Sequence, residues 1–364
     1  MVLLKSESIP MGRKKVNLCD VARIAGASKS TVSRVLNNKL GNGFSVTDSV
    51  KQRILDISKQ LGYRPNLIAQ SLSNQQRIMI HIFGGSHALH DLGDIYQTAV
   101  NEIVALIDNG VEDGSITVDM SSHRSNKSEL PPWHINAAVI LARCNPATVE
   151  ELEQANIPYV VINGPAGAKG SIVVPDDVNG MRLAVKYFVE NGHKKIAYAG
   201  PQAAFLQGHS SVYDRHNTYL TEMKKYGIQA MPGHDKLFST IKTYENLHNS
   251  AVEYIQTSVL QNKATAVIVY GHMEALNLMQ AAHSLGVAVP ERLSILCFCD
   301  QHACDIMSPS MSFIDLMSKE MGQAAAELLL RQLSQPDKIK PETIKLPERL
   351  ILRSTASAAP DIAL

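Results

Sequence analysis

The sequence predicts two folds in one chain: an N-terminal three-helix, helix-turn-helix headpiece and then an α/β domain built on doubly wound parallel sheets. Three observations support this. Short apolar stripes at helical spacing fill residues 16–64, whereas apolar runs of strand length alternate with helical patterns from residue 77 onward. Charge divides the chain in the same way. Residues 1–73 hold twelve Lys and Arg against four Asp and Glu, a net of +8, which leaves −7 for the rest of a chain of net charge +1.

Two short helical patterns with a small-residue turn between them open the headpiece. Asn17 is a favourable N-cap for the first, and Ser28 caps the second after the break at Gly26–Ala27. The polar face of the second helix fits the major groove, where such side chains meet base edges and phosphates. An ordinary two-helix surface hairpin would show the same periodicity, but the local positive charge favours binding to nucleic acid. The apolar stripes are Leu18, Val21, Ala22 and Ala25, then Val32, Val35 and Leu36; the polar face is Lys29, Ser30, Ser33, Arg34 and Asn37.

A third helix is predicted to follow Thr47, its N-cap, and to close a small core. Its apolar face is Val50, Ile54, Ile57 and Leu61. Residues 1–15 are expected to be a disordered basic lead. After Arg64–Pro65, residues 66–72 could form two turns of helix, too few to be stable alone.

Strands and helices alternate in the remainder, which predicts parallel sheets covered by helices on both faces. The predicted helices are residues 93–109, 146–155, 177–191, 211–227, 243–262, 273–286 and 317–334. The predicted strands are Ile78–Phe83, Ile116–Met120, Ala137–Ala142, Tyr159–Asn163, Lys195–Gly200, Ala266–Tyr270 and Leu293–Phe298.

Several function classes are disfavoured by composition and motifs. No apolar run reaches the length of a membrane span, and the N-terminus lacks a secretory apolar region, so no membrane partner is expected. Five cysteines in 364 residues fit a reducing cytoplasm better than a disulfide scaffold. GxSxG, Walker A and HExxH motifs are missing, so we predict no enzyme, no catalytic residues and no cofactor.

The segments DVARIAGASKSTVSRVLNN and LGYRPNLIAQSL resemble, in order and spacing, the DNA-binding headpiece of the LacI/GalR (lactose-repressor) family. The resemblance extends more weakly to about residue 353. It implies a cytoplasmic, nucleoid-associated homodimer that binds a palindromic operator, expected to act as a repressor. It also implies a periplasmic-binding-protein-like effector domain of two lobes, with a small-molecule, sugar-related effector in the cleft between them.

The resemblance assigns roles to headpiece and hinge residues. Arg34 is the best candidate for base readout, because a guanidinium can form two hydrogen bonds with one guanine. The hinge is expected to order in the dimer on DNA and to wedge Leu72 into the minor groove; family members commonly have Arg where Gln70 stands. The expected contacts are Lys29, Ser30 and Arg34 to bases; Asn17, Ser28, Thr31, Ser33 and Asn37 to phosphates; and Asn66, Ala69, Gln70 and Leu72 in the minor groove.

The effector cleft departs from the family pattern. Arg215 in YDRHNTY matches the family arginine that clamps a ligand carboxylate or sugar hydroxyls, and Asp176 in VPDDVNG matches the acidic position of the first lobe crossing. Two carboxylates that normally grip sugar hydroxyls are replaced by His272 and Cys299, the latter just before Asp300. These five residues are the predicted effector site. Two interpretations remain: a cleft for a different small molecule, such as an acidic or modified sugar, or a degenerate cleft controlled by a protein partner or by nothing.

A metal- or redox-responsive regulator is a further alternative, because Cys297, Cys299 and Cys304 with His272 are soft-metal ligands. Their spacing fits no closed zinc pattern, so no metal site is predicted. The predicted domains are the lead (1–15), the headpiece (16–64), the hinge (65–76), the effector and dimerisation domain (77–353) and a tail (354–364). The N-lobe is expected at 77–175 and 309–335, and the C-lobe at 178–307 and 338–353.

Overall fold

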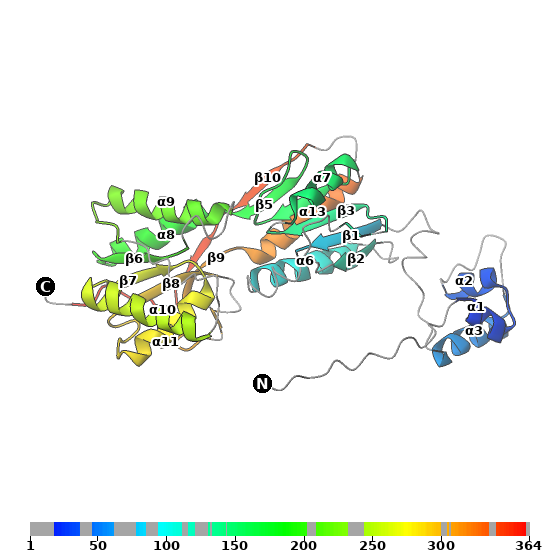
Figure 1. Ribbon diagram of the computed structural model, residues 1–364, viewed down its shortest axis with the longest axis horizontal. Helices are drawn as coiled ribbons and strands as arrows, with labels where there is room; N and C mark the ends of the chain where they lie inside the picture. Colours follow the sequence, from blue (N-terminus) through cyan, green and yellow to red (C-terminus); the bar gives the residue numbers. More distant parts are fainter. Residues whose placement is uncertain are drawn as a thin grey trace, which may run out of the picture. The chain divides into compact units, whose positions relative to one another are not determined.

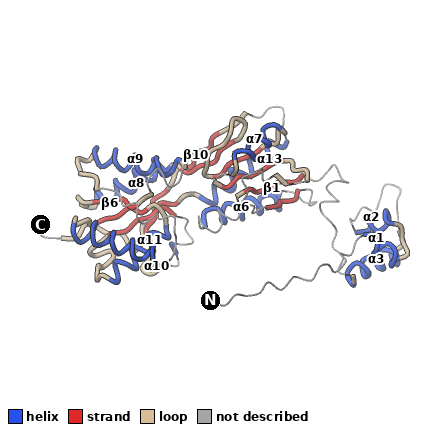
Figure 2. The backbone as a smooth tube through the Cα atoms, viewed as in Figure 1, coloured by secondary structure: helices blue, strands red, loops and turns tan. Residues whose placement is uncertain are grey.

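The computed structural model divides the chain into two compact units, Met1–Gln76 and Arg77–Leu364, hereafter the headpiece unit and the C-terminal unit. Each is described by itself (Figures 1 and 2). The structure describes residues 18–36, 46–61, 78–84, 94–110, 116–120, 130–131, 133–142, 144–201, 209–231, 244–299, 304–305, 307–334 and 340–361.

Three helices form the headpiece unit: α1 (Leu18–Ala25), α2 (Lys29–Leu36) and α3 (Asp48–Gln60). Ser28 caps α2 as predicted, because its Oγ accepts a hydrogen bond from the backbone N–H of Thr31 at 3.0 Å. The apolar stripes meet in one core whose buried members are Val21, Ala22, Ala25, Val32, Val35 and Ile54.

The first lobe of the C-terminal unit is a parallel sheet of six strands in the order β10-β5-β4-β3-β1-β2. Helices α6 (Asp94–Gly110) and α13 (Ser318–Ser334) pack together on one face, and α7 (Pro146–Gln154) covers the other. A Cβ atom on Gly322 would lie 2.4 Å from the carbonyl oxygen of Ala99, so α13 and α6 can cross this closely only with glycine there. The strands are β1 (Ile78–Phe83), β2 (Ile116–Met120), β3 (Ala137–Leu141), β4 (Tyr159–Ile162), β5 (Ser171–Pro175) and β10 (Thr343–Leu346).

The second lobe is a five-stranded sheet in the order β11-β9-β8-β7-β6, parallel except for β11. Buried side chains of α8 (Asp177–Glu190) and α9 (Ser210–Lys225) pack on one face, those of α10 (Tyr244–Tyr254) and α11 (His272–Ser284) on the other. A π-helical turn, Ile255–Gln261, continues α10. The strands are β6 (Ile196–Ala199), β7 (Ala266–Val269), β8 (Ser294–Cys299), β9 (Ser312–Asp315) and β11 (Arg349–Ile351).

Three crossings connect the lobes: Pro175 to Asp177, Asp315 to Ser318, and Leu346 to Arg349. The domain bounds predicted from the sequence place the first crossing between residues 175 and 178. The second follows β9, which is paired with β8 in the second sheet, so it lies a few residues after the predicted position. The third was placed near residue 335, about ten residues too early, because β10 is paired with β5 in the first sheet. This short, half-exposed edge strand has no apolar run that marks it in the sequence.

The C-terminal segment, predicted to be a tail, is hydrogen-bonded to the second lobe as far as Ala359. The Thr355 hydroxyl donates to the carbonyl oxygen of Ile295 at 2.8 Å, and the backbone N–H of Ala359 donates to the carbonyl oxygen of Asn191 at 2.9 Å. Residues 354–361 therefore complete this lobe.

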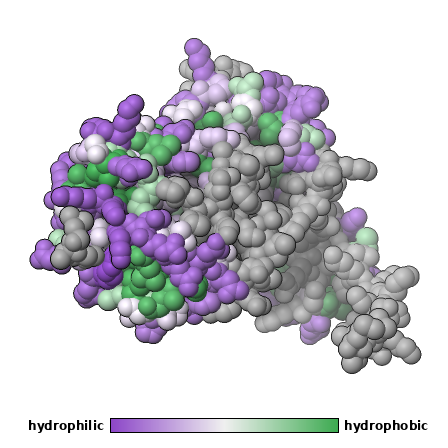
Figure 3. Space-filling view, turned by 60° about the vertical axis from the view of Figure 1, so that its left-hand side comes forward, coloured by the Kyte–Doolittle hydropathy of each residue, from purple (hydrophilic) through white to green (hydrophobic). Residues whose placement is uncertain are grey.

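Hydrophobic patches interrupt the largely hydrophilic coloured surface in Figure 3. Exposed large apolar side chains of the second lobe include Leu220 on α9 and Met273 and Leu276 on α11. In the part of the chain that the structure describes, every helix is too short or too polar to cross a bilayer.

Candidate functional site

The exposed face of α2 is the candidate nucleic-acid interface. Val32 and Val35 point into the core, which leaves Lys29, Ser30 and Arg34 exposed on the other side of the same two turns. Because α2 has no acidic residue in its first turn and carries Lys29 and Arg34, this face is cationic. These are the three residues predicted to read base edges.

The residues predicted to contact phosphates are placed only in part. Thr31 and Ser33 are half-buried on α2, and the Ser28 hydroxyl caps the helix while it also lies 2.8 Å from the hydroxyls of Ser30 and Thr31. The other predicted contacts, at Asn17, Asn37, Asn66, Ala69, Gln70 and Leu72, lie outside the described residues, as does Asp300 of the predicted effector site.

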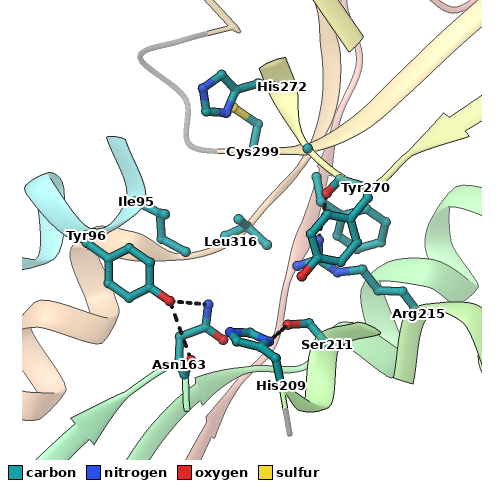
Figure 4. Close-up of a pocket in the computed structure, with 12 residues that line it drawn as sticks. Ile95, Tyr96, Asn163, His209, Ser211, Arg215, Tyr270, His272, Cys299 and Leu316 are labelled. Carbon is teal, nitrogen blue, oxygen red and sulfur yellow. Dashed lines mark hydrogen bonds between the residues drawn. The ribbon is translucent and has the colours of Figure 1, made fainter. Parts of the chain in front are cut away.

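A pocket lies between the two lobes, at the carboxyl ends of parallel strands of both sheets (Figure 4). Its empty space, open solvent included, is about 500 Å³. Open α/β sheets bind ligands at this edge. The lining residues are Ile95, Tyr96, Asn163, His209, Ser211, Arg215, Tyr270, Gly271, His272, Phe298, Cys299 and Leu316.

Arg215 is the best-anchored polar side chain of the pocket, and it is only 3% exposed. Its Nε donates to Asp177 Oδ1 at 2.5 Å, and its Nη1 donates to the carbonyl oxygen of Tyr270 at 2.8 Å. The guanidinium carbon lies 4.0 Å from the ring centre of Phe298 and 4.6 Å from that of Tyr270. Burial lowers the pKa of Arg215, but Asp177, Tyr270, Glu348 and Tyr198 together outweigh burial and raise it. Burial also raises the pKa of Asp177, although the charge of Arg215 opposes this. Arg215 is therefore a fixed cation between two aromatic rings.

The first lobe contributes Tyr96, at the start of α6, and Asn163, immediately after β4. Asn163 Nδ2 donates to the Tyr96 hydroxyl at 3.2 Å, while its buried Oδ1 has no hydrogen-bond partner among the described residues. This leaves an acceptor on the pocket wall. Asn163 has φ +54°, and a Cβ atom on Gly164 would lie on the carbonyl oxygen of Ala142. Asn163 is thus in the left-handed backbone conformation, which Asn tolerates better than most residues. Gly164 has no Cβ atom, and this allows its backbone to lie against the backbone of Ala142.

The second lobe contributes two histidines. His209 precedes α9 and its Nδ1 is hydrogen-bonded to the Ser211 hydroxyl, and His272 is the first residue of α11, beside Cys299 at the end of β8 (Figure 4). Arg215, His272 and Cys299 therefore lie on one pocket wall, in the region predicted from the sequence.

Asp176, a predicted effector-site residue, lies outside the pocket lining and caps a helix instead. Its Oδ1 accepts a hydrogen bond from the backbone N–H of Asn179 at 3.3 Å, so it caps α8 and is not among the lining residues. The carboxylate that pairs with Arg215 is Asp177, which the sequence analysis did not single out. It also did not single out Tyr96, His209 or Ser211, although their positions at helix starts after strand ends are a usable signal.

A second buried carboxyl, Glu348, lies at the third crossing and is 2% exposed. Neither carboxyl oxygen has a hydrogen-bond partner among the described residues, and Glu348 Oε2 packs against the α-carbon side of Gly180. Burial, and then the charge of Asp177, raise the pKa of Glu348 well above its ordinary value, while Arg215 opposes them; Asp176 and Asp315 also raise it. Asp177 and Glu348 are thus two carboxyl groups whose charges act on Arg215, from the first and the third crossing.

We expect Glu348→Gln to flatten the pH dependence of stability. An acid whose folded pKa is raised stabilises the fold fully below its unfolded pKa, about 4.3, and this contribution is lost as pH rises through the folded pKa. Each unit of upward shift amounts to about 1.4 kcal/mol of free energy at high pH. Urea unfolding at a series of pH values measures this, with fluorescence of the single Trp, Trp133, as the signal. The stability of Glu348→Gln relative to the parent should rise from acid to neutral pH; parallel profiles would contradict the assignment.

Three cysteines form a buried cluster next to the pocket: Cys297, Cys299 and Cys304. Their Sγ atoms all lie within 4.8 Å of one another. Hydrogen bonds from the Cys297 and Cys299 thiols lower the pKa of Cys304 to about 5, whereas burial raises that of Cys297. Cys299 belongs both to this cluster and to the pocket wall.

A helix-turn-helix headpiece joined to a two-lobed α/β domain with a cleft pocket defines a class of DNA-binding ligand sensors. The chain matches the family model "Bacterial regulatory proteins, lacI family" over residues 17–66 and the model "Periplasmic binding protein-like domain" over residues 185–356. Residues 17–66 are thus similar to the DNA-binding domain of LacI-family regulators, and residues 185–356 to a periplasmic-binding-protein-like domain.

Curated relatives and solved structures agree with this. The chain is 25% identical, over 88% of its length and 93% of the relative's, to the probable HTH-type transcriptional repressor ExuR of Bacillus subtilis. It is 24% identical to catabolite control protein A of Staphylococcus epidermidis, over 93% of this chain and 99% of that protein. Its fold matches the lac repressor dimer bound to operator and the anti-inducer ONPF with a TM-score of 0.66 and 24% identity, covering 95% of this chain and all of the other.

Proposed function

We propose that this protein is a sequence-specific transcriptional regulator that represses by binding a palindromic operator as a homodimer. The observation that carries the proposal is the cationic, exposed face of α2, with Lys29 and Arg34, held on a well-packed three-helix core. The charge asymmetry of +8 against −7 supports it, since Lys and Arg near phosphates release counterions and drive association. It acts in the cytoplasm, on the nucleoid, and not as an enzyme.

The proposed binding mode places one α2 helix of each protomer in successive major grooves. Lys29, Ser30 and Arg34 read base edges, and Asn17, Ser28, Thr31, Ser33 and Asn37 position the headpiece on phosphates. Between the two half-sites, the hinge residues Asn66, Ala69, Gln70 and Leu72 enter the minor groove, where Leu72 wedges into a base step.

The effector we propose is a small anionic molecule, such as a sugar acid. The polar lining of the pocket holds three groups that carry or can take a positive charge, Arg215, His209 and His272, together with the neutral side chains of Tyr96, Asn163 and Ser211. Among the described lining residues there is no carboxylate, because Asp177 lies behind Arg215. A wall of this kind favours a carboxylate or phosphate over a neutral polyol, and Asn163 Oδ1 can accept a hydrogen bond from a ligand hydroxyl.

Gel-shift selection from genomic fragments tests the DNA part of this proposal. The full-length protein should enrich palindromic fragments, and the logarithm of its affinity should fall linearly as the logarithm of salt concentration rises. Absence of binding to every fragment at low salt would overturn it. Thermal-shift screening against neutral sugars, sugar acids and phosphosugars tests the effector part; stabilisation by neutral sugars alone would contradict the anionic assignment.

We expect Arg34→Ala to relax the base preference at one position of each half-site by about 1–3 kcal/mol. Arg34 is exposed on α2, opposite Val32 and Val35. Arg53→Ala is the matched control, because it removes the same charge from exposed α3 of the same unit. Binding-site selection should give an altered consensus for Arg34→Ala and the parental one for Arg53→Ala. An unchanged consensus for Arg34→Ala would contradict its role in readout.

A further inference from the structure

The three cysteines of the second lobe converge from two separate segments. Cys297 and Cys299 are two apart on β8 and share a face of the strand, and Cys304 returns to them after residues 300–303. The carbonyl oxygen of Cys304 accepts a hydrogen bond from the backbone N–H of Met311 at 3.4 Å, which ties this return to the start of β9. All three side chains are at most 1% exposed, and all three sulfurs lie within 4.8 Å of one another.

The positions of the three sulfurs suit a shared metal ion better than a disulfide between Cys297 and Cys299. Residues two apart on a strand are separated by about 6.6 Å along its axis, whereas a disulfide needs Cβ atoms about 3.5–4.5 Å apart, so Cys297 and Cys299 do not pair with each other. Around a tetrahedral Zn²⁺ with Zn–S bonds of about 2.3 Å, the sulfurs are about 3.8 Å apart. The three sulfurs lie close to that arrangement already.

A fourth ligand is available at the cleft. His272 begins α11 directly after β7, the neighbour of β8, and lines the same pocket as Cys299 (Figure 4). Its nitrogens are not among the ligand atoms that lie within 4.8 Å of one another, so the imidazole must turn about its side-chain bonds to reach an ion held by the three sulfurs. Because His272 and Cys299 both line the pocket, an ion has a route from solvent to the buried sulfurs.

We propose that Cys297, Cys299 and Cys304, together with His272, form a binding site for one thiophilic metal ion, Zn²⁺ in the first instance, on the wall of the effector cleft. The three sulfurs, with the imidazole of His272 turned toward them, supply the four ligands of a tetrahedral set, and thiolates select zinc and similar metals over hard cations. Binding deprotonates the thiols and releases their protons to solvent. The site goes beyond the proposed function, since metal binding depends on neither the operator nor the anionic effector.

Cobalt substitution of the full-length, reduced, metal-free protein tests the site. One equivalent of Co²⁺ should give thiolate-to-cobalt charge transfer and the intense ligand-field absorption of a tetrahedral centre, and one equivalent of Zn²⁺ should abolish both. Chelator competition then gives the Zn²⁺ affinity. Cys297→Ser and Cys304→Ser should each lower it by more than about 100-fold, since removing even an outer-shell partner of a ligand costs 10–100-fold. His272→Ala should lose tetrahedral intensity.

Cys144→Ser is the control, because Cys144 lies in the same unit, in the apolar cluster around β3 and β4 and outside the metal-ligand group. It should bind Co²⁺ as the parent does, and Trp133 fluorescence confirms that each variant is folded. The proposal is overturned if the parent protein gives no cobalt–thiolate band, or if folded Cys297→Ser and Cys304→Ser both keep it. A disulfide from Cys304 to Cys297 or Cys299 that forms on mild oxidation, with no metal bound at stoichiometric Co²⁺, also overturns it and assigns the cluster to thiol oxidation.

Discussion

Replacement of Asp177 by Asn is expected to destabilise the C-terminal unit by about 3–5 kcal/mol, because it leaves a buried guanidinium without its counter-charge. Asp177 and Arg215 are each 3% exposed, and the arginine is enclosed by the rings of Tyr270 and Phe298. The pair also joins α8, which follows the first crossing, to α9, so its loss loosens the wall of the pocket.

Urea unfolding followed by Trp133 fluorescence measures this effect, since the only tryptophan of the chain lies in the C-terminal unit. Glu342→Gln is the matched control: it removes a carboxylate from the Arg331–Glu342 pair, whose side chains are 56% and 50% exposed. Its cost should stay below about 1 kcal/mol. Adding Arg215→Met to Asp177→Asn should recover part of the loss, because the orphan charge is then gone. Equal losses for Asp177→Asn and Glu342→Gln would show that the buried pair is not the cause.

The architecture was predictable because each element carries its own local pattern. The predicted helix 146–155 corresponds to α7 (Pro146–Gln154), and the predicted strand Ile78–Phe83 is β1 itself. Buried parallel strands are continuous apolar runs and amphipathic helices repeat at 3.6 residues, so both are legible in one sequence. Four of the described strands are absent from the prediction. β10 and β11 are half-exposed edge strands of three or four residues and have neither pattern. β5 and β9 are mostly buried, but each is only four or five residues long and is bounded by Ser, Pro or Asp, so its apolar run is too short to mark it.

The pocket was predictable only in part, because some of its contacts depend on how a helix is rotated and on how separate segments meet. Arg215, His272 and Cys299 lie after strand ends or near helix starts. Both the family resemblance and the α/β topology predict a ligand site at such positions. Which of two adjacent aspartates faces Arg215 depends on the rotation of the first turn of α8, and the sequence does not encode that rotation visibly. Asp176 caps the helix and Asp177 turns inward. The meeting of Cys304 with Cys297 and Cys299 likewise depends on how the chain returns after β8.

Replacement of Ile54 by Ala is expected to unfold the headpiece unit and abolish operator binding while the C-terminal unit stays folded. Ile54 on α3 is fully buried against Val21 and Val32, and truncation of a buried Ile typically costs about 2–5 kcal/mol. A domain of fewer than about 70–80 residues rarely has more than about 3–5 kcal/mol of stability. The cavity therefore removes most or all of it, and α2 loses the scaffold that holds Lys29 and Arg34 on one face.

Leu55→Ala separates this effect from a general loss of apolar surface, because Leu55 is the next residue on α3 and 39% exposed. Operator gel shifts, far-UV circular dichroism and Trp133 fluorescence together give the answer. We expect Ile54→Ala to lose the gel shift and some helical signal with an unchanged Trp133 transition, and Leu55→Ala to bind within a few-fold of the parent. If Ile54→Ala bound operator as tightly as Leu55→Ala, recognition would not depend on the packed three-helix core, and α2 could not be the element that reads the groove from a rigid support.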